Sequence, residues 1–394
     1  MNPYPKNQES ALKWNYKFWN TQPVMKLKEI VSLDGPILTQ EIINSDEKTA
    51  ALLPDEFQWV SYNMSNMNDI NTVSSFLDKH YVEDVNGMFR LHYSPEFIEW
   101  MYKDSINLGV GITVKKNGLL VGFICGKVTK MQVNKNKLDM VEVNLLCIHP
   151  KLREKRLVPV LINELTRQFQ QKGYIYANYT AGNYLPTPIF TTTYYHRALN
   201  IKTLIDTEFT TLDKNTNVTN VKKALKLPEK FIIKNFRKME DTHLDECFDL
   251  YNKYMEKYNY HHIFTKEEFK HIFFNNKFVT CYVVLDDDEN VLDFISYYIM
   301  RSRVLQNNSK HEFLNKAVLF YYTCLNETPY RLIKDILIVA RNNNIDVFDA
   351  LELMENQYIL KELGFDEGNG MLHYYLYNWK TKPFKNTQVA ALMI

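Results

Sequence analysis

The stretch EVNLLCIHPKLREKRLVPVLINELTRQF, from Glu142 to Phe169, contains the transition that best indicates the fold. It opens as an apolar strand, breaks at Pro150, passes through a basic turn and continues as a helix. The helix is indicated by an apolar residue at every fourth position, and Pro159 falls in its first turn, where proline is tolerated. Between these two apolar elements the turn carries four bases, Lys151, Arg153, Lys155 and Arg156.

A basic turn at the start of a helix is a candidate anion site. The helix dipole and the unpaired amides of the first turn favour phosphate, and arginine adds a fork of donors. The turn lacks both the GxxxxGK[ST] pattern of an NTPase loop and the GxGxxG pattern of a dinucleotide fold. We therefore expect a pyrophosphate along this turn, with a solvated helix start as the alternative interpretation.

The elements around this stretch occur twice in the chain. Residues 110–131, VGITVKKNGLLVGFICGKVTKM, predict a β-hairpin around Lys-Asn-Gly, and residues 173–186 supply a further strand after the helix. Residues 278–300, 317–343 and 344–356 repeat the order of hairpin, strand, turn, helix and strand about 175 residues later. Two matching units predict an internally duplicated α/β protein.

The two copies differ in the charge of the turn. The first reads HPKLREKR and the second NETPYRLIKD, which has fewer bases and an added acid. A purely structural turn has no reason to become basic in only one copy, so the first turn is the better candidate for a site. Between the copies, the polar residues 212–230 are expected to form a crossover loop.

The composition narrows the classes of function. A chain of 394 residues is long for one core, and its net charge of +1 provides no basic field for nucleic acid or a membrane surface. The five cysteines lack metal-ligand or redox spacing and are expected to be reduced, buried thiols. We find no leader sequence, and the longest apolar stretches have strand length. We therefore expect a cytoplasmic protein without stable membrane insertion.

Several ordered motifs resemble one known family. The strand EVNLLCIHP is similar to E-I-N-F-L-C-x-H-K, the signature of eukaryotic N-myristoyltransferases. Seven further stretches resemble motifs of the same family, in the same order and over nearly the whole chain. They are YKFWNTQPV, GMFRLHYSPEF, LREKRLVPVLINELTR, YTAGNYLPTPI, YYHRALN, DVFDALELMEN and HYYLYNW. The resemblance implies an α/β fold of two fused acetyltransferase-like (GNAT) halves, with pseudo-two-fold symmetry and a continuous mixed, saddle-shaped sheet.

The resemblance also implies an organisation and an activity. Residues 1–10 would be a flexible arm, 11–210 a half that binds myristoyl-CoA, and 211–394 a half that holds the peptide and returns its C-terminal tail to the active site. The activity would be transfer of myristate from myristoyl-CoA, the co-substrate, to the amine of an N-terminal glycine in protein substrates. We expect no metal and no nucleic-acid partner, and we expect the protein to be a monomer.

The resemblance assigns residues to three roles. Backbone amides of Leu145 and Leu146 would form an oxyanion hole, which requires a bulge in the strand, and the terminal carboxylate of Ile394 would be the general base. The acyl-CoA side would comprise Tyr16, Lys17, Phe18, Trp19, Leu145, Leu146, Cys147, Ile148, Arg153, Glu154, Lys155, Arg156, Leu157 and Val158. The peptide side would comprise Val82, Asp84, Phe89, Tyr93, Asn144, Thr180, Tyr194, His196, Ser296 and Asn369.

The last residues support the expected base. The sequence KTKPFKNTQVAALMI finishes with the six apolar residues VAALMI, none of them charged, whereas chain ends usually fray in solvent. An apolar end predicts insertion of Ile394 into the protein, although a tail that merely covers a core edge is the alternative. Because a thioester is already activated, Cys147 is expected to pack rather than catalyse, and His149 and His196 are expected to be core or peptide-contact residues.

The peptide side and the turn also show departures from the family pattern. An acidic loop with Glu83 and Asp84 beside aromatic residues suits a peptide that carries a downstream lysine. Asn369 stands where the family has an acid, and Glu154 stands where it has a small hydroxyl residue. Two rivals remain open at this point: an acetyltransferase with the same fold and an acyl-CoA-binding sensor without turnover.

Overall fold

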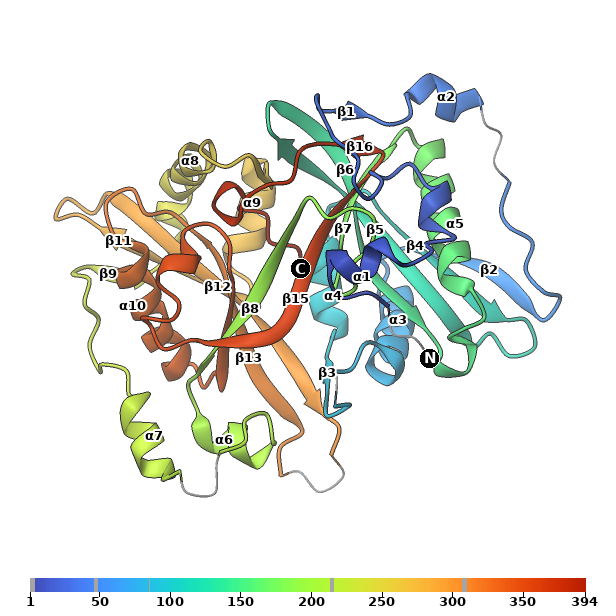
Figure 1. Ribbon diagram of the computed structural model, residues 1–394. Coiled ribbons are helices and arrows are strands. Elements are labelled where there is room, and N and C mark those ends of the chain that lie inside the picture. The colour runs from blue at the N-terminus through green and yellow to red at the C-terminus, as the bar shows by residue number, and fades with distance from the viewer. Residues whose placement is uncertain (1–3, 46–48, 85, 213–215, 307–309) are drawn as a thin grey trace.

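The computed structural model describes the chain apart from residues 1–3, 46–48, 85, 213–215 and 307–309 (Figure 1). In the first copy, a turn with Gly118 at φ +68° closes the predicted hairpin, and glycine adopts this left-handed conformation without steric cost. The expected strand, helix and strand follow. The five elements are β4 (Asn107–Val114), β5 (Leu120–Val133), β6 (Asn136–Ile148), α5 (Leu157–Gln171) and β7 (Tyr176–Ala181).

The second copy repeats this order, which confirms the predicted duplication. In each copy the strand after the helix pairs in parallel with the strand before it, as a crossover connection requires. The matching elements are β11 (Val279–Leu285), β12 (Val291–Val304), β13 (Phe313–Tyr322), α10 (Pro329–Asn342) and β14 (Val347–Leu351). Figure 1 shows α5 and α10 towards opposite ends of the sheet.

Two exchanged strands join the copies into one sheet. Strand β8 (Phe190–Ala198) follows the first copy but pairs with β14, and β15 (Asp366–Tyr377) follows the second copy but pairs with β7. The two exchanged strands also pair with each other. With β2 (Phe57–Tyr62) and β9 (Phe236–Lys238) at the ends, the order β2-β4-β5-β6-β7-β15-β8-β14-β13-β12-β11-β9 has the same plan from either side. The expected fold class is confirmed.

The halves interlock further through two short strands. Strand β10 (Tyr260–His262) of the second half pairs with β5, and β3 (Phe89–Leu91) of the first half pairs with β12. Each half contributes strands that pair with strands of the other half. The boundary between residues 210 and 211 therefore stays a prediction that divides the sequence. It does not separate two independently packed bodies.

The segment between the copies contains a helix that the sequence analysis missed. Within residues 212–230, α7 spans Val218–Ala224, and the Asn217 side chain caps it by accepting a hydrogen bond from the amide of Thr219. The polar residues that suggested a loop therefore start a helix, which is a common use of asparagine. Residues 213–215 of the expected loop lie outside the described residues.

The described part of the predicted flexible arm is docked on the protein. Helix α1 (Gln8–Leu12) starts inside it, with Asn7 as its cap. The carbonyl of Pro5 accepts a hydrogen bond from the amide of Tyr184 at 2.8 Å. These contacts with the loop after β7 contradict a free arm from residue 4 onward, and residues 1–3 lie outside the described part.

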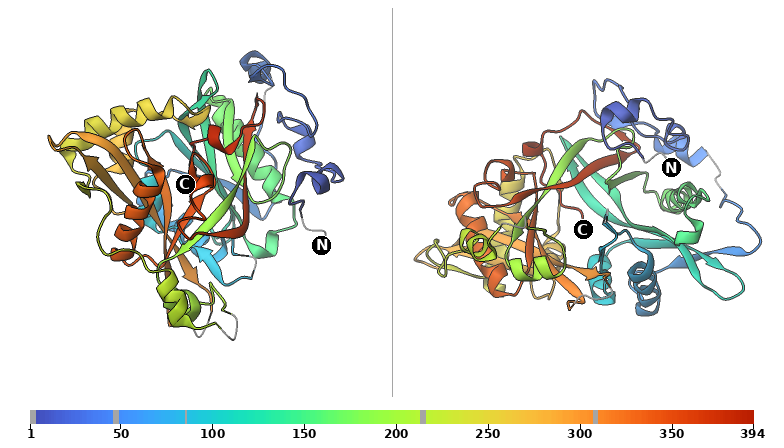
Figure 2. Two further views of the ribbon diagram at one scale, coloured as in Figure 1. Left: turned by 60° about the vertical axis from the view of Figure 1, so that its left-hand side comes forward. Right: turned by 60° about the horizontal axis from the view of Figure 1, so that its bottom comes forward.

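The chain returns to the middle of the molecule at its end, as Figure 2 shows in two views. Val389, Ala390 and Ala391 are fully buried, and the Ala390 amide donates to the carbonyl of Tyr260 in β10. The apolar tail is therefore inserted as far as Leu392, whereas Met393 and Ile394 are partly exposed. Burial of the terminal carboxylate stays a prediction.

The remaining elements complete the covering of the sheet. They are β1 (Gly35–Pro36), α2 (Gln40–Ser45), α3 (Met67–His80), α4 (Pro95–Tyr102), α6 (Ile201–Asp206), α8 (Leu244–Met255), α9 (Lys266–Phe273) and β16 (Trp379–Lys380), with short 3₁₀ turns at Trp19–Thr21, Pro150–Leu152, Asp241–His243, Asn356–Tyr358 and Asn386–Gln388.

Candidate active site

Strand β6 bulges where the sequence analysis expected a distortion. Phe123 pairs with Cys147 and Cys125 with Asn144, so that two residues of β6, Leu145 and Leu146, stand opposite a single residue of β5. Leu145 has a left-handed backbone with φ +56°. On its other side, β6 pairs with β7 only from Met140 to Glu142. The bulge therefore lies where two parallel strands separate and where backbone amides leave the regular ladder.

The second copy has the corresponding bulge without the strained residue. There Phe320 and Tyr321 of β13 stand opposite Ser296 of β12. Neither Phe320 nor Tyr321 has a positive φ, in contrast to Leu145. The bulge is thus part of the duplicated plan, and the left-handed residue is particular to the first copy.

The basic turn leads into a helix start without a side-chain cap. Arg156, at φ +58°, occupies the N-cap position of α5 and forms no capping hydrogen bond. In the second copy the hydroxyl of Thr328 caps α10 by accepting from the amide of Arg331. The first amides of α5 thus lack the satisfying side chain that those of α10 have, and free amides at a helix start can bind an anion.

The bases of the turn divide into one brace and three exposed cations. Arg153 donates to the carbonyls of Ile148 at 3.2 Å and of His80 at 2.7 Å, which ties the turn to α3. Lys151, Lys155 and Arg156 are exposed. Glu154 is also exposed and has a left-handed backbone at φ +55°.

The N-terminal aromatic residues pack beside β7 and β15. The hydroxyl of Tyr16 donates to the carbonyl of Tyr184 at 2.5 Å. Trp19 stacks on Tyr179 of β7 with ring centroids 5.4 Å apart, and Tyr179 stacks on Tyr375 of β15 at 5.0 Å. This stack places the segment Tyr16–Trp19 along the sheet on the first-copy side.

The carboxyl end of the chain lies next to the bulge. The side-chain amide of Asn144, the residue before Leu145, donates to the backbone oxygen of Ile394 at 3.0 Å. The same nitrogen lies 3.1 Å from Oε1 of Glu142. The structure therefore brings together Asn144, Leu145 and Ile394, which sequence resemblance assigned to one reaction centre.

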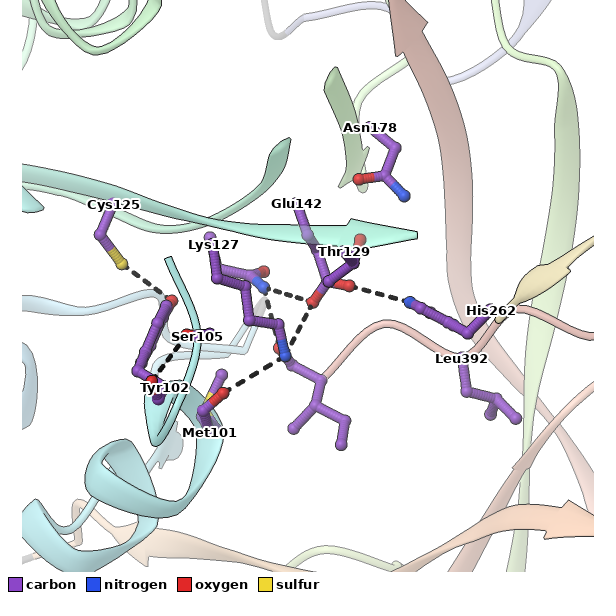
Figure 3. A network of polar contacts seen from close by, with 12 residues as sticks. Met101, Tyr102, Ser105, Cys125, Lys127, Thr129, Glu142, Asn178, His262 and Leu392 are labelled. Carbon is purple, nitrogen blue, oxygen red and sulfur yellow. Dashed lines mark hydrogen bonds and ion pairs between the residues drawn. The ribbon is translucent and has the colours of Figure 1, made fainter. Parts of the chain in front are cut away.

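Behind this centre lies a buried charge cluster that the sequence analysis missed (Figure 3). Glu142 is 1% exposed, with Lys127 Nζ 3.6 Å from Oε1 and His262 Nε2 3.1 Å from Oε2. Burial raises the pKa of Glu142, but the charge of Lys127 and the hydrogen bonds from His262 and Asn144 outweigh it and hold the pKa below its ordinary value. The sequence did contain one sign of this cluster, because Glu142 is an acid within the otherwise largely apolar run MVEVNLLCI.

The acidic residues Glu83 and Asp84, which were expected to contact a basic peptide, form hydrogen bonds and an ion pair within the protein. The Asp84 carboxylate accepts hydrogen bonds from the amides of Met88 at 2.6 Å and Phe89 at 2.7 Å. Glu83 forms an ion pair with Arg90. These contacts shape the loop, and the expected contact of its acids with a peptide stays a prediction. Asp84, Asn86 and Gly87 are residues that favour turns, and this pattern was readable in the sequence.

His196 lies in a second ionic cluster. Its Nδ1 is 2.6 Å from Oδ1 of Asp349, whose other oxygen is 2.8 Å from Nζ of Lys316. Burial raises the pKa of Asp349, but Lys316 and the hydrogen bond from His196 lower it to a net value below the ordinary one. A Cβ added to Gly368 in β15 would lie 2.6 Å from Nε2 of His196, so this strand closely confines the ring.

The other predicted peptide-side residues are spread over several elements. Phe89 belongs to β3, Thr180 to β7 and Tyr194 to β8, whereas Tyr93 stacks edge-on with Tyr81. Ser296 is fully buried, and its hydroxyl donates to the carbonyl of Tyr321 at 2.7 Å. The two most exposed positions are Val82, at 65%, and Asn369, in an irregular part of β15.

The cysteines fit the packing role expected of them. All five are free, and burial raises the pKa of Cys147 to about 12, so that its thiol stays protonated at neutral pH. His149 lies with its ring 4.5 Å from that of His80, and its Nδ1 accepts from the amide of Lys151.

Two further properties concern the described residues as a whole. Within them, no group of three His, Cys, Asp or Glu side chains is arranged to hold a metal ion. No described helix has both the length and the apolar character needed to cross a membrane.

Comparisons with known proteins identify the family. Models of the N-terminal and C-terminal domains of myristoyl-CoA:protein N-myristoyltransferase match residues 36–192 and 206–391. The glycylpeptide N-tetradecanoyltransferase of Drosophila melanogaster is 37% identical over 96% of this chain and 81% of its own length. That of Plasmodium falciparum (isolate 3D7) is 36% identical over 99% of this chain and 96% of its own. A crystal structure of Saccharomyces cerevisiae N-myristoyltransferase with bound myristoyl-CoA has a TM-score of 0.89 at 33% identity and covers 97% of this chain and 95% of that one. The chain therefore belongs to the myristoyl-CoA:protein N-myristoyltransferase family.

Proposed function

We propose that the chain transfers myristate from myristoyl-CoA to the α-amine of an N-terminal glycine in its protein substrates, with Ile394 as the general base. The coarser part follows from the family: the chain is an acyltransferase that moves a myristoyl group from myristoyl-CoA to proteins. The observation that carries the finer part is the hydrogen bond from Asn144 to the carboxyl end of Ile394, one residue from the bulge.

The proposed site for the CoA diphosphate is the turn before α5. The uncapped amides of Leu157 and Val158 would bind its oxygens, and the exposed Arg156 would add charge-assisted hydrogen bonds. Arg153 is already used as a brace, so its contribution would be to hold the turn in place. The segment Tyr16–Trp19 would flank the remainder of CoA, and Cys147 and Ile148 would line the acyl chain.

The proposed chemical step is a direct attack on the thioester. The neutral amine of glycine adds to the carbonyl carbon, and negative charge develops on the carbonyl oxygen. Backbone amides at Leu145 and Leu146 would stabilise this oxyanion, an interaction for which one donor is commonly worth about 3 kcal/mol. The carbon–sulfur bond then breaks, and the leaving CoA thiolate takes the second proton of the nitrogen, so that the amide and free CoA thiol are the products. Cys147 is unsuited as a nucleophile, because its raised pKa keeps the thiol protonated.

The base has to accept a proton from an ammonium group. In water, an α-amine of pKa about 8 and a terminal carboxylate of pKa about 3.5 are mismatched by about 6 kcal/mol. Removing both groups from water raises the carboxylate pKa and lowers the amine pKa, which narrows this gap. The buried residues before Ile394 would supply that environment, since Val389, Ala390 and Ala391 are inaccessible to solvent.

Turnover with defined substrates tests the proposal. Purified protein is mixed with myristoyl-CoA and an octapeptide that begins with glycine, and release of free CoA thiol is measured. Parallel reactions use the N-acetylated peptide, which has no free amine, and acetyl-CoA. We expect release only with myristoyl-CoA and the free amine.

Each rival has its own outcome in this experiment. Faster release of CoA thiol from acetyl-CoA than from myristoyl-CoA would indicate an acetyltransferase. Tight binding of myristoyl-CoA without release of CoA thiol would indicate a sensor. Proteins with an N-terminal glycine are the partners that the proposal implies. A cytoplasmic location and a monomeric state stay predictions from the sequence.

A further inference from the structure

Glu142 is a buried ion that the reaction proposed above does not use. Its carboxylate is 1% exposed and is surrounded by Lys127, His262 and Asn144. A buried ionic cluster is weak evidence for stability, because well-packed apolar side chains usually serve a fold as well. The contacts of Glu142 therefore call for a second reason. Its contact with Lys127 leads to the carbonyl of Met101, to which Nζ donates at 3.4 Å. Its contacts with Asn144 and His262 lead to the C-terminal tail.

The first route passes through Asn144. Its amide nitrogen has two donor hydrogens, and the two acceptors within reach are Oε1 of Glu142 at 3.1 Å and the backbone oxygen of Ile394 at 3.0 Å. A flipped amide would bring its oxygen against the Glu142 carboxylate. Glu142 thus selects the amide orientation that donates to Ile394.

The second route passes through His262 and Tyr321. A carboxylate only accepts hydrogen bonds, so Nε2 of His262 donates to Oε2 of Glu142 at 3.1 Å. In the tautomer that carries its proton on Nε2, Nδ1 accepts the hydrogen bond that the hydroxyl of Tyr321 donates at 2.8 Å. The same hydroxyl oxygen accepts the amide of Leu392 at 3.3 Å. This route therefore ends two residues before Ile394.

We propose that Glu142, His262 and Tyr321 are positioning residues that hold the tail at two points and thereby aim the Ile394 carboxylate at the substrate amine. This inference rests on the proposed function of Ile394 as the base. The relay spans β6, β10 and β13, so it connects the tail to both copies of the duplicated unit. Ser296, which donates to the carbonyl of Tyr321, braces the second route.

The variant Tyr321→Phe tests the relay because it removes one hydroxyl and leaves Glu142, Lys127 and Asn144 unchanged. Tyr297→Phe is the matched control. Both tyrosines are fully buried in neighbouring strands, and the Tyr297 hydroxyl bonds with Asn343 and Thr280, which lie outside the site. The measurements are kcat, the peptide KM, the myristoyl-CoA Kd and the melting temperature.

We expect kcat to fall about tenfold in Tyr321→Phe, which corresponds to the loss of about one hydrogen bond on the reaction path. The myristoyl-CoA Kd should stay within about twofold of the wild-type value, since the relay does not touch the acyl-CoA side. The control should lose a similar amount of thermal stability and keep its kcat. Equal kcat values for the two variants would overturn the relay.

Deleting Ile394 in parallel separates this inference from the proposed function. Lost turnover after the deletion, together with normal turnover in Tyr321→Phe, would overturn the relay and leave the base in place. Normal turnover after the deletion would overturn both. If Tyr321→Phe does not fold, His262→Leu takes its place, because it removes both ring nitrogens and with them the hydrogen bonds to Glu142 and Tyr321; normal kcat in that variant would equally overturn the relay.

Discussion

Arg156→Gly separates charge from backbone shape at the proposed phosphate turn. Arg156 has φ +58° and caps α5 without a side-chain hydrogen bond. An L-residue in this left-handed conformation costs about 1–2 kcal/mol, whereas glycine adopts it freely and loses about 0.5–1 kcal/mol in chain entropy. We therefore expect the free energy of unfolding to stay the same or to rise by up to about 1 kcal/mol.

Binding of myristoyl-CoA should change in the opposite direction. Hydrogen bonds between charged groups contribute about 1.5–3 kcal/mol, which corresponds to a Kd about 10- to 150-fold higher when the guanidinium is lost. The turn is exposed, so this part of the affinity is screened by salt. The variant should accordingly show a shallower salt dependence of Kd than the wild type.

The assay is calorimetric titration with myristoyl-CoA at low and high salt, together with urea unfolding. Arg331→Ala is the control, since it makes the same change in net charge at the equivalent turn of the second copy, where Arg331 is paired with Glu327 at 2.8 Å. We expect the control to keep the wild-type Kd. A Kd for Arg156→Gly that equals the wild-type value at low salt would refute the reasoning about this turn.

Two further predictions concern the peptide side. Gly368→Ala should raise the peptide KM several-fold and leave the myristoyl-CoA Kd unchanged, because the added Cβ would lie 2.6 Å from Nε2 of His196. Gly370→Ala is the control. Its Cβ would lie 3.8 Å from the nearest atom, on Tyr194, so it should match the wild type in steady-state kinetics. The folded-state pKa of Asp349 is lowered, with burial opposed by Lys316 and His196, so its contribution to stability is complete above the ordinary pKa of 3.8 and is lost as the pH falls through the folded-state value. Asp349→Asn should therefore be less stable than the wild type at pH 7 by about 3–5 kcal/mol, with the difference narrowing below pH 4. Urea unfolding of Asp349→Asn and the wild type over this pH range measures the stability difference and its pH dependence. A difference that does not depend on pH would contradict the lowered folded-state pKa of Asp349.

Local patterns in the sequence sufficed for the duplicated unit, whereas the bulge was expected from the family resemblance. The hairpins, the helices α5 and α10 and the inserted tail each follow from periodicity or polarity within a short window. The exchange of β8 and β15 was not readable, because strand partners distant in sequence are selected by packing across the whole sheet. Helix α7 was taken for a loop for a local reason, because its residues are polar and none of them is buried.

The candidate site shows the same division between local and long-range information. Residues near the bulge and the turn could be assigned from motifs in a single stretch. The buried cluster could not, since Lys127 and His262, which contact Glu142, and Tyr321, which contacts His262, come from three other strands. Arg153 and Asp84 were assigned to ligands because their sequence patterns reveal charge but not the backbone groups that already satisfy it.

The most direct test of the mechanism replaces one group at the chain end. Joining a synthetic C-terminal segment by ligation yields a protein in which Ile394 ends in a carboxamide, which keeps an oxygen for Asn144 but cannot accept the proton. Loss of a general base typically costs about 10²- to 10⁴-fold in rate, so we expect kcat to fall by that factor while the myristoyl-CoA Kd stays unchanged. A carboxamide enzyme that turns over at the wild-type rate would contradict the account.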